Sequence, residues 1–290
     1  MFPITAVIDE PPALTIVDVG AMDLGNAPRW QRLLDAGAAR VVGFEPVEAE
    51  CARLNETAAH GHRYLPYAIG DGAQRTLHVT RFPACTSLYA PNVTFLELFQ
   101  DLAPLFEVVA SDSVATRRLD DIVELRETGC DFMKLDIQGA ERDALENATR
   151  LLATTLVVET EVIFTPMYEG QPGLGDIDRV LRRNGFIIHR HLGNGGRTLK
   201  PMLAHGGPGA YLSQQLWCDM VYVKDFTRAA SLPTEGWIKF AMLMHEVFDA
   251  FDLAHLALAH ADRRAGSSLA ARYSAAHRTE WSPAIQVKER

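Results

Sequence analysis

LTIVDVGA (14–21) decides the fold of this 290-residue chain. It is a short apolar run that ends in Asp18-Val19-Gly20-Ala21, a pattern typical of a strand buried on both faces of a parallel sheet. ARVVGFEP (39–46) repeats the pattern. More apolar runs, at 62–70, 130–139, 155–164, 186–192 and 216–226, alternate with amphipathic stretches. We expect an extra strand at 76–82, a helix on an insertion at 95–106 and an amphipathic helix at 140–152. This alternation predicts an α/β fold with a doubly wound, mostly parallel sheet.

The end of the sheet and the tail have different patterns. No helical stretch separates 186–192 from 216–226, so we expect these two strands to pair antiparallel near a sheet edge. Residues 1–226 are therefore expected to form a Rossmann-like domain and residues 227–290 a helical extension. An apolar stripe from Trp237 to Ala254 gives the extension a surface that packs on the core or forms a homodimer.

Composition limits the partners and the compartment. Lys and Arg number 28 against 37 Asp and Glu, a net charge of −9, which argues against nucleic acid or anionic lipid as a partner. The four cysteines form no C-x-x-C pair and fit a reducing compartment. The sequence shows no signal peptide and no apolar run of membrane-spanning length. We expect a cytoplasmic protein with no membrane span.

The ends of the first two strands hold candidate ligand-binding residues. In an open parallel sheet, ligands lie at the carboxyl ends of the strands. Gly20 ends the first strand and lets the backbone approach a ligand closely, and Glu45 ends the second, where a carboxylate accepts hydrogen bonds from a ribose diol. The alternative for Glu45 is a charge that complements a helix N-terminus.

Two later strands carry pairs of charged residues. Lys134 and Asp136 share a face of the strand at 130–139, which is costly in a buried strand unless the two are paired or functional. Glu159 and Glu161 share a face in the next apolar run, and we expect at least one of them in the cleft. Mutual ion pairing is the alternative for Lys134 and Asp136.

Five ordered motifs resemble those of the FkbM family of S-adenosylmethionine-dependent methyltransferases. They are VDVGA (17–21), GFEP (43–46), AIGD (68–71), KLDIQGAE (134–141) and E-x-x-F-x-P-x-Y-E-G-Q-P (161–172). The resemblance covers about residues 14–226. It implies a class I methyltransferase fold, a seven-stranded sheet with an antiparallel last strand, and S-adenosylmethionine as cofactor. It also implies methyl transfer to a hydroxyl, often on a sugar or a polyketide product.

The resemblance also implies a cofactor pocket. Asp18, Gly20 and Ala21 would line the methionine part, Glu45 with Pro46 would hold the ribose, and Ala68, Ile69 and Gly70 would flank the adenine, with Asp136 beside the methyl group. Two departures stand out. Met22 and Leu24 occupy the first loop where the family usually has Asn and Gly, and Gln138 stands where the family usually has Glu.

Asp136 is our first candidate for the residue that positions or deprotonates the methyl acceptor, and Glu161 is the second. Lys134 would orient Asp136 or neutralise its charge. His189 and His191 are weaker candidates. We expect no metal, although Asp120 and Asp121 offer oxygen ligands; Asp120 more simply caps a helix.

One alternative function is a nicotinamide-dependent oxidoreductase, but the sequence lacks the G-x-G-x-x-G motif of such enzymes. A catalytically impaired, S-adenosylmethionine-binding partner protein is another, motivated by Met22, Leu24 and Gln138.

Overall fold

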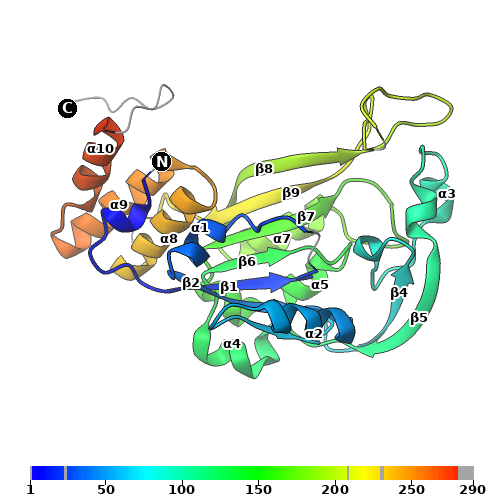
Figure 1. Cartoon of the computed structure of the whole chain (residues 1–290), viewed down its shortest axis with the longest axis horizontal. Coiled ribbons are helices and arrows are strands. Elements are labelled where there is room, and N and C mark those ends of the chain that lie inside the picture. Colours follow the sequence, from blue (N-terminus) through cyan, green and yellow to red (C-terminus); the bar gives the residue numbers. More distant parts are fainter. Residues whose placement is uncertain (1, 23–24, 208, 229–231, 280–290) are drawn as a thin grey trace. The chain divides into compact units, whose positions relative to one another are not determined.

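A seven-stranded sheet forms the centre of the computed structural model, which describes residues 2–22, 25–207, 209–228 and 232–279. The strand order is β3-β2-β1-β6-β7-β9-β8 (Figure 1). The strands are β1 Leu14–Val19, β2 Ala39–Phe44, β3 Arg63–Leu65, β6 Phe132–Leu135, β7 Val157–Ile163, β8 Phe186–Gly196 and β9 Gln215–Lys224. β2 and β6 pair parallel with β3 and β7, whereas β9 runs antiparallel to both β7 and β8. The predicted fold class and the reversed strand beside a sheet edge are confirmed.

An insertion between β3 and β6 forms a second, smaller sheet. β4 (Gln74–Thr80) pairs antiparallel with β5 (Val108–Ala115), so the strand expected at 76–82 exists but lies outside the main sheet. Figure 1 shows this long hairpin at the end of the main sheet toward which the arrows of β6 and β7 point. The insertion is therefore placed where the strand-end residues lie.

Local helix propensity misleads in two places. The helix expected at 95–106 is instead α3 (Val93–Leu96) and a 3-10 turn at Ala103–Phe106. Asp101 has a φ of 52°, and the Gln100 N–H donates to the Thr198 carbonyl, so the chain leaves the helix to pair with the segment before β9. The helix expected at 140–152 is divided into α5 (Glu141–Glu146) and α6 (Thr149–Thr154). Tertiary pairing overrides the amphipathic pattern in the first case.

The chain divides into two compact units. One comprises residues 17–23 and 41–224 and the other residues 1–16, 24–40 and 225–290. The first unit also contains α2 (Glu48–Thr57), α4 (Val123–Thr128) and α7 (Leu174–Arg183), and its core is built from fully buried side chains such as Met133, Leu135 and Leu145. The domain boundary at 226 stays a prediction.

The second unit is mainly helical. It contains α1 (Gln31–Asp35), α8 (Thr234–Glu246), α9 (Phe251–Ala265) and α10 (Leu269–Thr279). Trp237 and Phe240 of α8 are fully buried, and the Trp237 ring stacks on His260 of α9. Within the described residues, no helix has the length and apolar character needed to cross a membrane. The expected homodimer surface on these helices stays a prediction.

Asp120 stabilises the start of α6. Its Oδ2 accepts the Arg150 N–H at 2.8 Å and its Oδ1 accepts the Leu151 N–H at 2.9 Å, so one carboxylate satisfies two N–H groups that lack partners inside the helix. This is the capping interpretation, although the capped helix lies some 30 residues further along the chain rather than directly after Asp120. A carboxylate used in this way is a poor candidate for a metal ligand.

We predict that Asp120→Ala lowers the free energy of unfolding by about 1 kcal/mol, because the first turn of α6 loses its acceptor. Urea denaturation measures the change. Asp121→Ala removes the adjacent, exposed carboxylate and serves as the matched control, with an effect below about 0.5 kcal/mol. Equal effects of the two substitutions would contradict the capping role.

Candidate active site

The turn after β1 lies directly against the end of β6. Gly20 has a φ of 80°, and a Cβ at this position would come within 2.0 Å of the Asp136 carbonyl oxygen. The Asp136 N–H donates to the Val19 carbonyl at 3.0 Å, and the Gly20 and Ala21 N–H groups both donate to the Phe44 carbonyl at 3.0 Å. The ends of β1, β2 and β6 are thus held together by backbone hydrogen bonds, and only glycine fits at position 20.

Lys134 lies between two carboxylates at this edge. Its Nζ is 3.3 Å from Asp136 Oδ2 and 3.9 Å from Asp18 Oδ1. Burial alone lowers the pKa of Lys134, but the charges of Asp136 and Asp18 outweigh it and raise the net value. Burial raises the pKa of Asp18 to about 6, against the opposing charge of Lys134. The ion pair of Lys134 with Asp136, which was the alternative to a functional role, is present, and it includes Asp18.

Glu45 is buried at the end of β2, with 2% of its surface exposed. Its Oε1 accepts the Val47 N–H at 2.9 Å, just before α2, and burial raises the pKa of its carboxyl group. The half-buried Pro46 follows it. The carboxylate therefore contacts the start of a helix, as the alternative interpretation expected, while remaining at the strand end that the ligand interpretation requires.

The segment expected to flank the adenine is tied to the chain after β5. The Arg117 N–H donates to the Ala68 carbonyl at 2.8 Å, and the Gly70 N–H donates to the Arg117 carbonyl at 3.0 Å. A Cβ on Gly70 would lie 3.1 Å from the Thr116 side chain. Ala68, Ile69 and Gly70 are thereby fixed in an extended segment, and Ala68 and Ile69 are buried.

Gln138 connects the acids of β6 and β7. Its Nε2 donates to Asp136 Oδ1 at 2.9 Å and to Glu161 Oε2 at 2.8 Å. Its Oε1 accepts from the Tyr168 hydroxyl at 2.8 Å. From the sequence, Gln138 was recognised only as a difference from the Glu that is usual in the family, and Tyr168 was not predicted to have a role. A tyrosine hydroxyl buried in a polar motif needs a partner, and that requirement was the available signal.

Two further glutamates in this region are buried. Glu161 is 8% exposed, and burial, with the nearby charge of Asp136, raises the pKa of its carboxyl group well above the ordinary value. Glu141 is 1% exposed and accepts the Ile137 and Gly139 N–H groups, and burial raises the pKa of its carboxyl group to about 7. Glu159 stands opposite Lys134 in the β6–β7 register. Glu161 is the glutamate of β7 that joins the Asp136 cluster.

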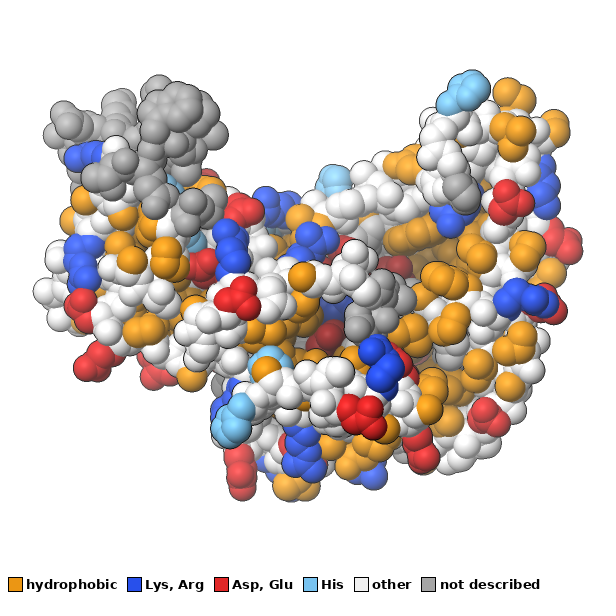
Figure 2. Space-filling view, viewed as in Figure 1, with side chains coloured by type: hydrophobic (Ala, Val, Ile, Leu, Met, Phe, Trp, Pro, Cys, Tyr) orange, Lys and Arg blue, Asp and Glu red, His pale blue; other side chains and the backbone are white. Residues whose placement is uncertain are grey.

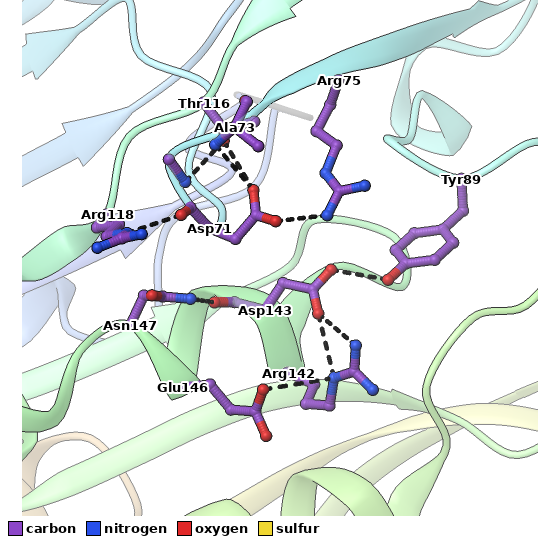
Figure 3. Close-up of polar contacts among 11 residues, drawn as sticks. Asp71, Ala73, Arg75, Tyr89, Thr116, Arg118, Arg142, Asp143, Glu146 and Asn147 are labelled. Carbon is purple, nitrogen blue, oxygen red and sulfur yellow. Dashed lines mark hydrogen bonds and ion pairs between the residues drawn. The ribbon is translucent and has the colours of Figure 1, made fainter.

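The insertion is anchored beside this cluster. Ser87 Oγ donates to the Gln138 carbonyl at 2.6 Å, and the Tyr89 hydroxyl donates to Asp143 Oδ2 at 2.7 Å. Figure 3 shows Arg142 holding the other oxygen of Asp143, and Asp71 in contact with Arg75 on the hairpin side. The Arg75 guanidinium, with the Ala73 N–H, lowers the pKa of Asp71 to about 2. Residues 87–89 therefore form a fixed wall next to Asp136.

The weaker candidates lie elsewhere. His189 and His191 belong to β8, the edge strand, which is separated from β6 by β7 and β9. Met22 is half-buried, whereas Leu24 lies outside the described residues. In the part of the chain that the structure describes, no three His, Cys, Asp or Glu side chains gather in a way that could hold a metal ion.

The comparisons with known proteins agree with this geometry. The family model described as "Methyltransferase FkbM domain" matches residues 18–188. No curated protein matches the sequence.

Similar solved structures include the magnesium protoporphyrin IX methyltransferase of Synechocystis PCC 6803 with bound SAM. It is 15% identical, covers 77% of this chain and 76% of its own, and has a TM-score of 0.34. A putative methyltransferase from Thermoplasma acidophilum is 10% identical, covers 73% and 69%, and has a TM-score of 0.37. At these TM-scores neither structure supports a statement about activity.

The ends of β1, β2 and β6 meet beside Asp136, in a sheet whose strand β9 runs antiparallel to β7. This arrangement is that of a methyltransferase-type α/β protein. The chain belongs to the methyltransferase FkbM family, whose model covers more than half of its length. The family uses S-adenosylmethionine as methyl donor, so the cofactor predicted from the sequence is confirmed.

The residues at this edge fit that cofactor. Within the described residues, the buried Asp18 Oδ1 has no hydrogen-bond partner and faces Lys134 at 3.9 Å, so an acceptor remains for a cationic amino group. Gly20 lets the end of β1 lie directly against the end of β6, and Glu45 supplies a carboxylate at the end of β2. Asp18, Gly20, Ala21 and Glu45 would hold the cofactor here, and their individual roles stay predictions.

We predict that Gly20→Ala abolishes S-adenosylmethionine binding, because the added Cβ displaces the end of β6. Isothermal titration calorimetry measures the affinity, and circular dichroism checks that the variant is folded. Gly25→Ala is the matched control, since Gly25 also has a positive φ of 82° but a Cβ there meets nothing within 4 Å. If both variants lose affinity equally, backbone strain rather than the contact with Asp136 is the cause.

The raised pKa of Glu161 predicts a pH dependence of stability. The folded protein keeps a proton that the unfolded chain releases near pH 4.5, so stability falls as the pH rises from about 4.5 toward the folded pKa, by at most about 1.4 kcal/mol per pH unit. Glu161→Gln cannot ionise and is expected to flatten this part of the curve. Urea denaturation at several pH values measures it, and an unchanged slope contradicts the burial argument.

Proposed function

We propose that this protein transfers the methyl group of S-adenosylmethionine to a hydroxyl oxygen of a sugar, a glycan or a small natural product. The observation that carries the proposal is the position of Asp136. It ends β6, accepts from Lys134 on one oxygen and from Gln138 on the other, and its side chain is still 35% exposed. An oriented and accessible carboxylate of this kind accepts a hydrogen bond from an alcohol.

When bound, S-adenosylmethionine supplies a methyl group attached to a positively charged sulfur. The chain must hold the acceptor oxygen in line with that methyl group and accept the hydroxyl proton. Asp136 does both in this proposal, because it is the accessible member of the cluster. Lys134 offsets the charge of Asp136 and fixes its orientation. Glu161 is buried behind Gln138 and balances the charge of the cluster by holding a proton.

Hydrophobic side chains near the site support an acceptor with a carbon skeleton. Figure 2 shows a hollow between the tip of the β8–β9 hairpin and the β4–β5 hairpin, with hydrophobic side chains gathered in it. Phe164, three residues after Glu161, is 41% exposed, and Leu98 and Leu199 are also exposed. The Lys200 N–H donates to the Leu98 carbonyl at 2.9 Å and joins these two segments. This surface favours a small natural product over a bare sugar.

The proposal is tested with S-adenosylmethionine carrying a labelled methyl group and a panel of alcohols, sugars and polyketide-like acceptors. A labelled methyl ether supports it. Labelled product only on amines or carbon acceptors replaces O-methylation with another transfer. Tight cofactor binding with no transfer to any acceptor class favours the catalytically impaired binding protein.

We predict that Asp136→Asn lowers kcat by a factor of about 10² to 10⁴, the usual contribution of a positioned proton acceptor. The asparagine keeps the shape of the side chain but removes its charge. Asp131→Asn makes the same change at the opposite end of the same strand, directly before β6, and is expected to leave kcat unchanged. An Asp136→Asn variant with normal turnover removes this residue from the mechanism.

A further inference from the structure

The side-chain amide of Gln138 links Asp136, at the end of β6, to Glu161 on β7. One nitrogen, Nε2, lies 2.9 Å from Asp136 Oδ1 and 2.8 Å from Glu161 Oε2. An amide nitrogen has two hydrogens, so each carboxyl group can receive one. No side chain with a carboxyl group could donate to both, because a protonated carboxyl has one hydrogen and an ionised carboxyl has none.

The two acids fix the orientation of this amide, and the Tyr168 hydroxyl lies on its other side. The Tyr168 hydroxyl lies 2.8 Å from Gln138 Oε1 and 3.0 Å from the Cys85 carbonyl, and Tyr168 itself is fully buried. The Gln138 carbonyl accepts from Ser87 Oγ at 2.6 Å. A flipped amide would place an oxygen against Asp136 and Glu161 and lose two hydrogen bonds. The surroundings therefore select the orientation in which the nitrogen faces the acids.

The backbone of Gln138 is also held in an uncommon conformation. Its φ is 54°, a region that residues with a Cβ seldom adopt, and the following Gly139 has a φ of 102°. Glu141 accepts the N–H groups of Ile137 and Gly139 on either side of it. Strain of this kind persists only where the surroundings enforce it, and it often marks functional sites. The turn places the amide between the two strand ends.

We propose that Gln138 is a positioning residue for methyl transfer: its amide holds Asp136 and Glu161 as a pair and fixes the orientation of Asp136 toward the acceptor. This inference rests on the proposed role of Asp136 in that reaction. Gln138 acts through Asp136 rather than on the acceptor, and its amide can donate one hydrogen to each of the two acids at the same time. The replacement of an acid at this position is thus compatible with an active enzyme.

Electrostatics sharpen the inference. The charges of Asp136, Glu141, Asp219 and Lys134 act on Glu161, and the charge of Glu161 acts on Tyr168, Cys85 and Cys218. A second cation, Arg197, acts on Cys85. Lys134 is the cation that acts on Glu161 itself, so an additional carboxylate at position 138 has little to offset it. As the pH rises and that carboxylate ionises, it repels Asp136, and it repels Glu161 once Glu161 has also lost its proton, so the pair separates.

The experiment compares Gln138→Glu with Gln171→Glu. The first change replaces the nitrogen that faces the two acids with an oxygen of nearly the same size. The second makes the same chemical change at the glutamine whose Oε1 accepts the Tyr168 N–H at 2.7 Å, which leaves the donor to Asp136 and Glu161 in place. Both substitutions introduce one carboxyl group beside Tyr168, so general effects of added charge are matched.

Two readouts are measured between pH 5.5 and 9. The first is the free energy of unfolding from urea denaturation, which needs no acceptor. We expect Gln138→Glu to lie close to wild type at pH 5.5 and to lose stability progressively as the pH rises, whereas Gln171→Glu follows the wild-type curve. The second is methyl transfer, with kcat of Gln138→Glu falling at least tenfold relative to wild type toward pH 9, and KM for S-adenosylmethionine within a factor of three.

The outcomes separate this inference from the proposed function. A pH-dependent loss of stability in Gln138→Glu but not in Gln171→Glu supports the pairing even if no hydroxyl acceptor is found. A pH-independent difference, or equal behaviour of the two variants, overturns it. If the pairing is seen in stability but kcat follows wild type at every pH, Gln138 has a structural role and the positioning inference is wrong. Gln138→Asn, which shortens the amide, is expected to lower kcat without the dependence on pH.

Discussion

The half-buried Lys134 is the cation on which the strand ends around Asp136 depend. It lies between Asp18 and Asp136, with Glu159 opposite it in the neighbouring strand. A lysine in a buried strand is costly unless its charge is balanced, and a carboxylate beside it is costly for the same reason. The pair is stable because each side offsets the desolvation of the other. Removing either charge would leave its partner unbalanced at the point where β1 and β6 end.

The acids at this edge nevertheless outnumber the lysine. Burial raises the pKa of Asp18 to about 6 and that of Glu141 to about 7, and it raises the pKa of Glu161 further above its ordinary range. Protons on these groups, or a positively charged ligand, must supply the missing positive charge. A sulfonium with an amino group meets that need. The excess of buried acid is therefore consistent with a cationic cofactor, and it is the reason that we expect the stability to depend on pH.

The strand ends could be predicted from the sequence because a parallel sheet fixes where they lie. Short apolar runs end in Gly20, Glu45 and Asp136. Because the strands are neighbours in the sheet, these residues lie together at the carboxyl ends of the strands, and this placement does not depend on the loop conformations. The helices were less predictable. The stretch 95–106 has helical amphipathicity, yet Gln100 and Phe99 pair with the chain before β9, and such long-range pairing leaves no local signal. The partners of Gln138 come from three separate segments and were hidden for the same reason.

The insertion explains why the turn at Gln138 can keep its strained conformation. Ser87 donates to the Gln138 carbonyl, the Tyr89 N–H donates to Ser87 Oγ, and the Tyr89 hydroxyl reaches Asp143 on α5. On the far side, the Glu169 N–H donates to the Ala90 carbonyl, so the loop is held from both flanks. The added hairpin thus does more than cover the sheet edge. It supplies the contacts that stabilise a positive φ at a residue with a side chain, and that conformation directs the amide to the two acids.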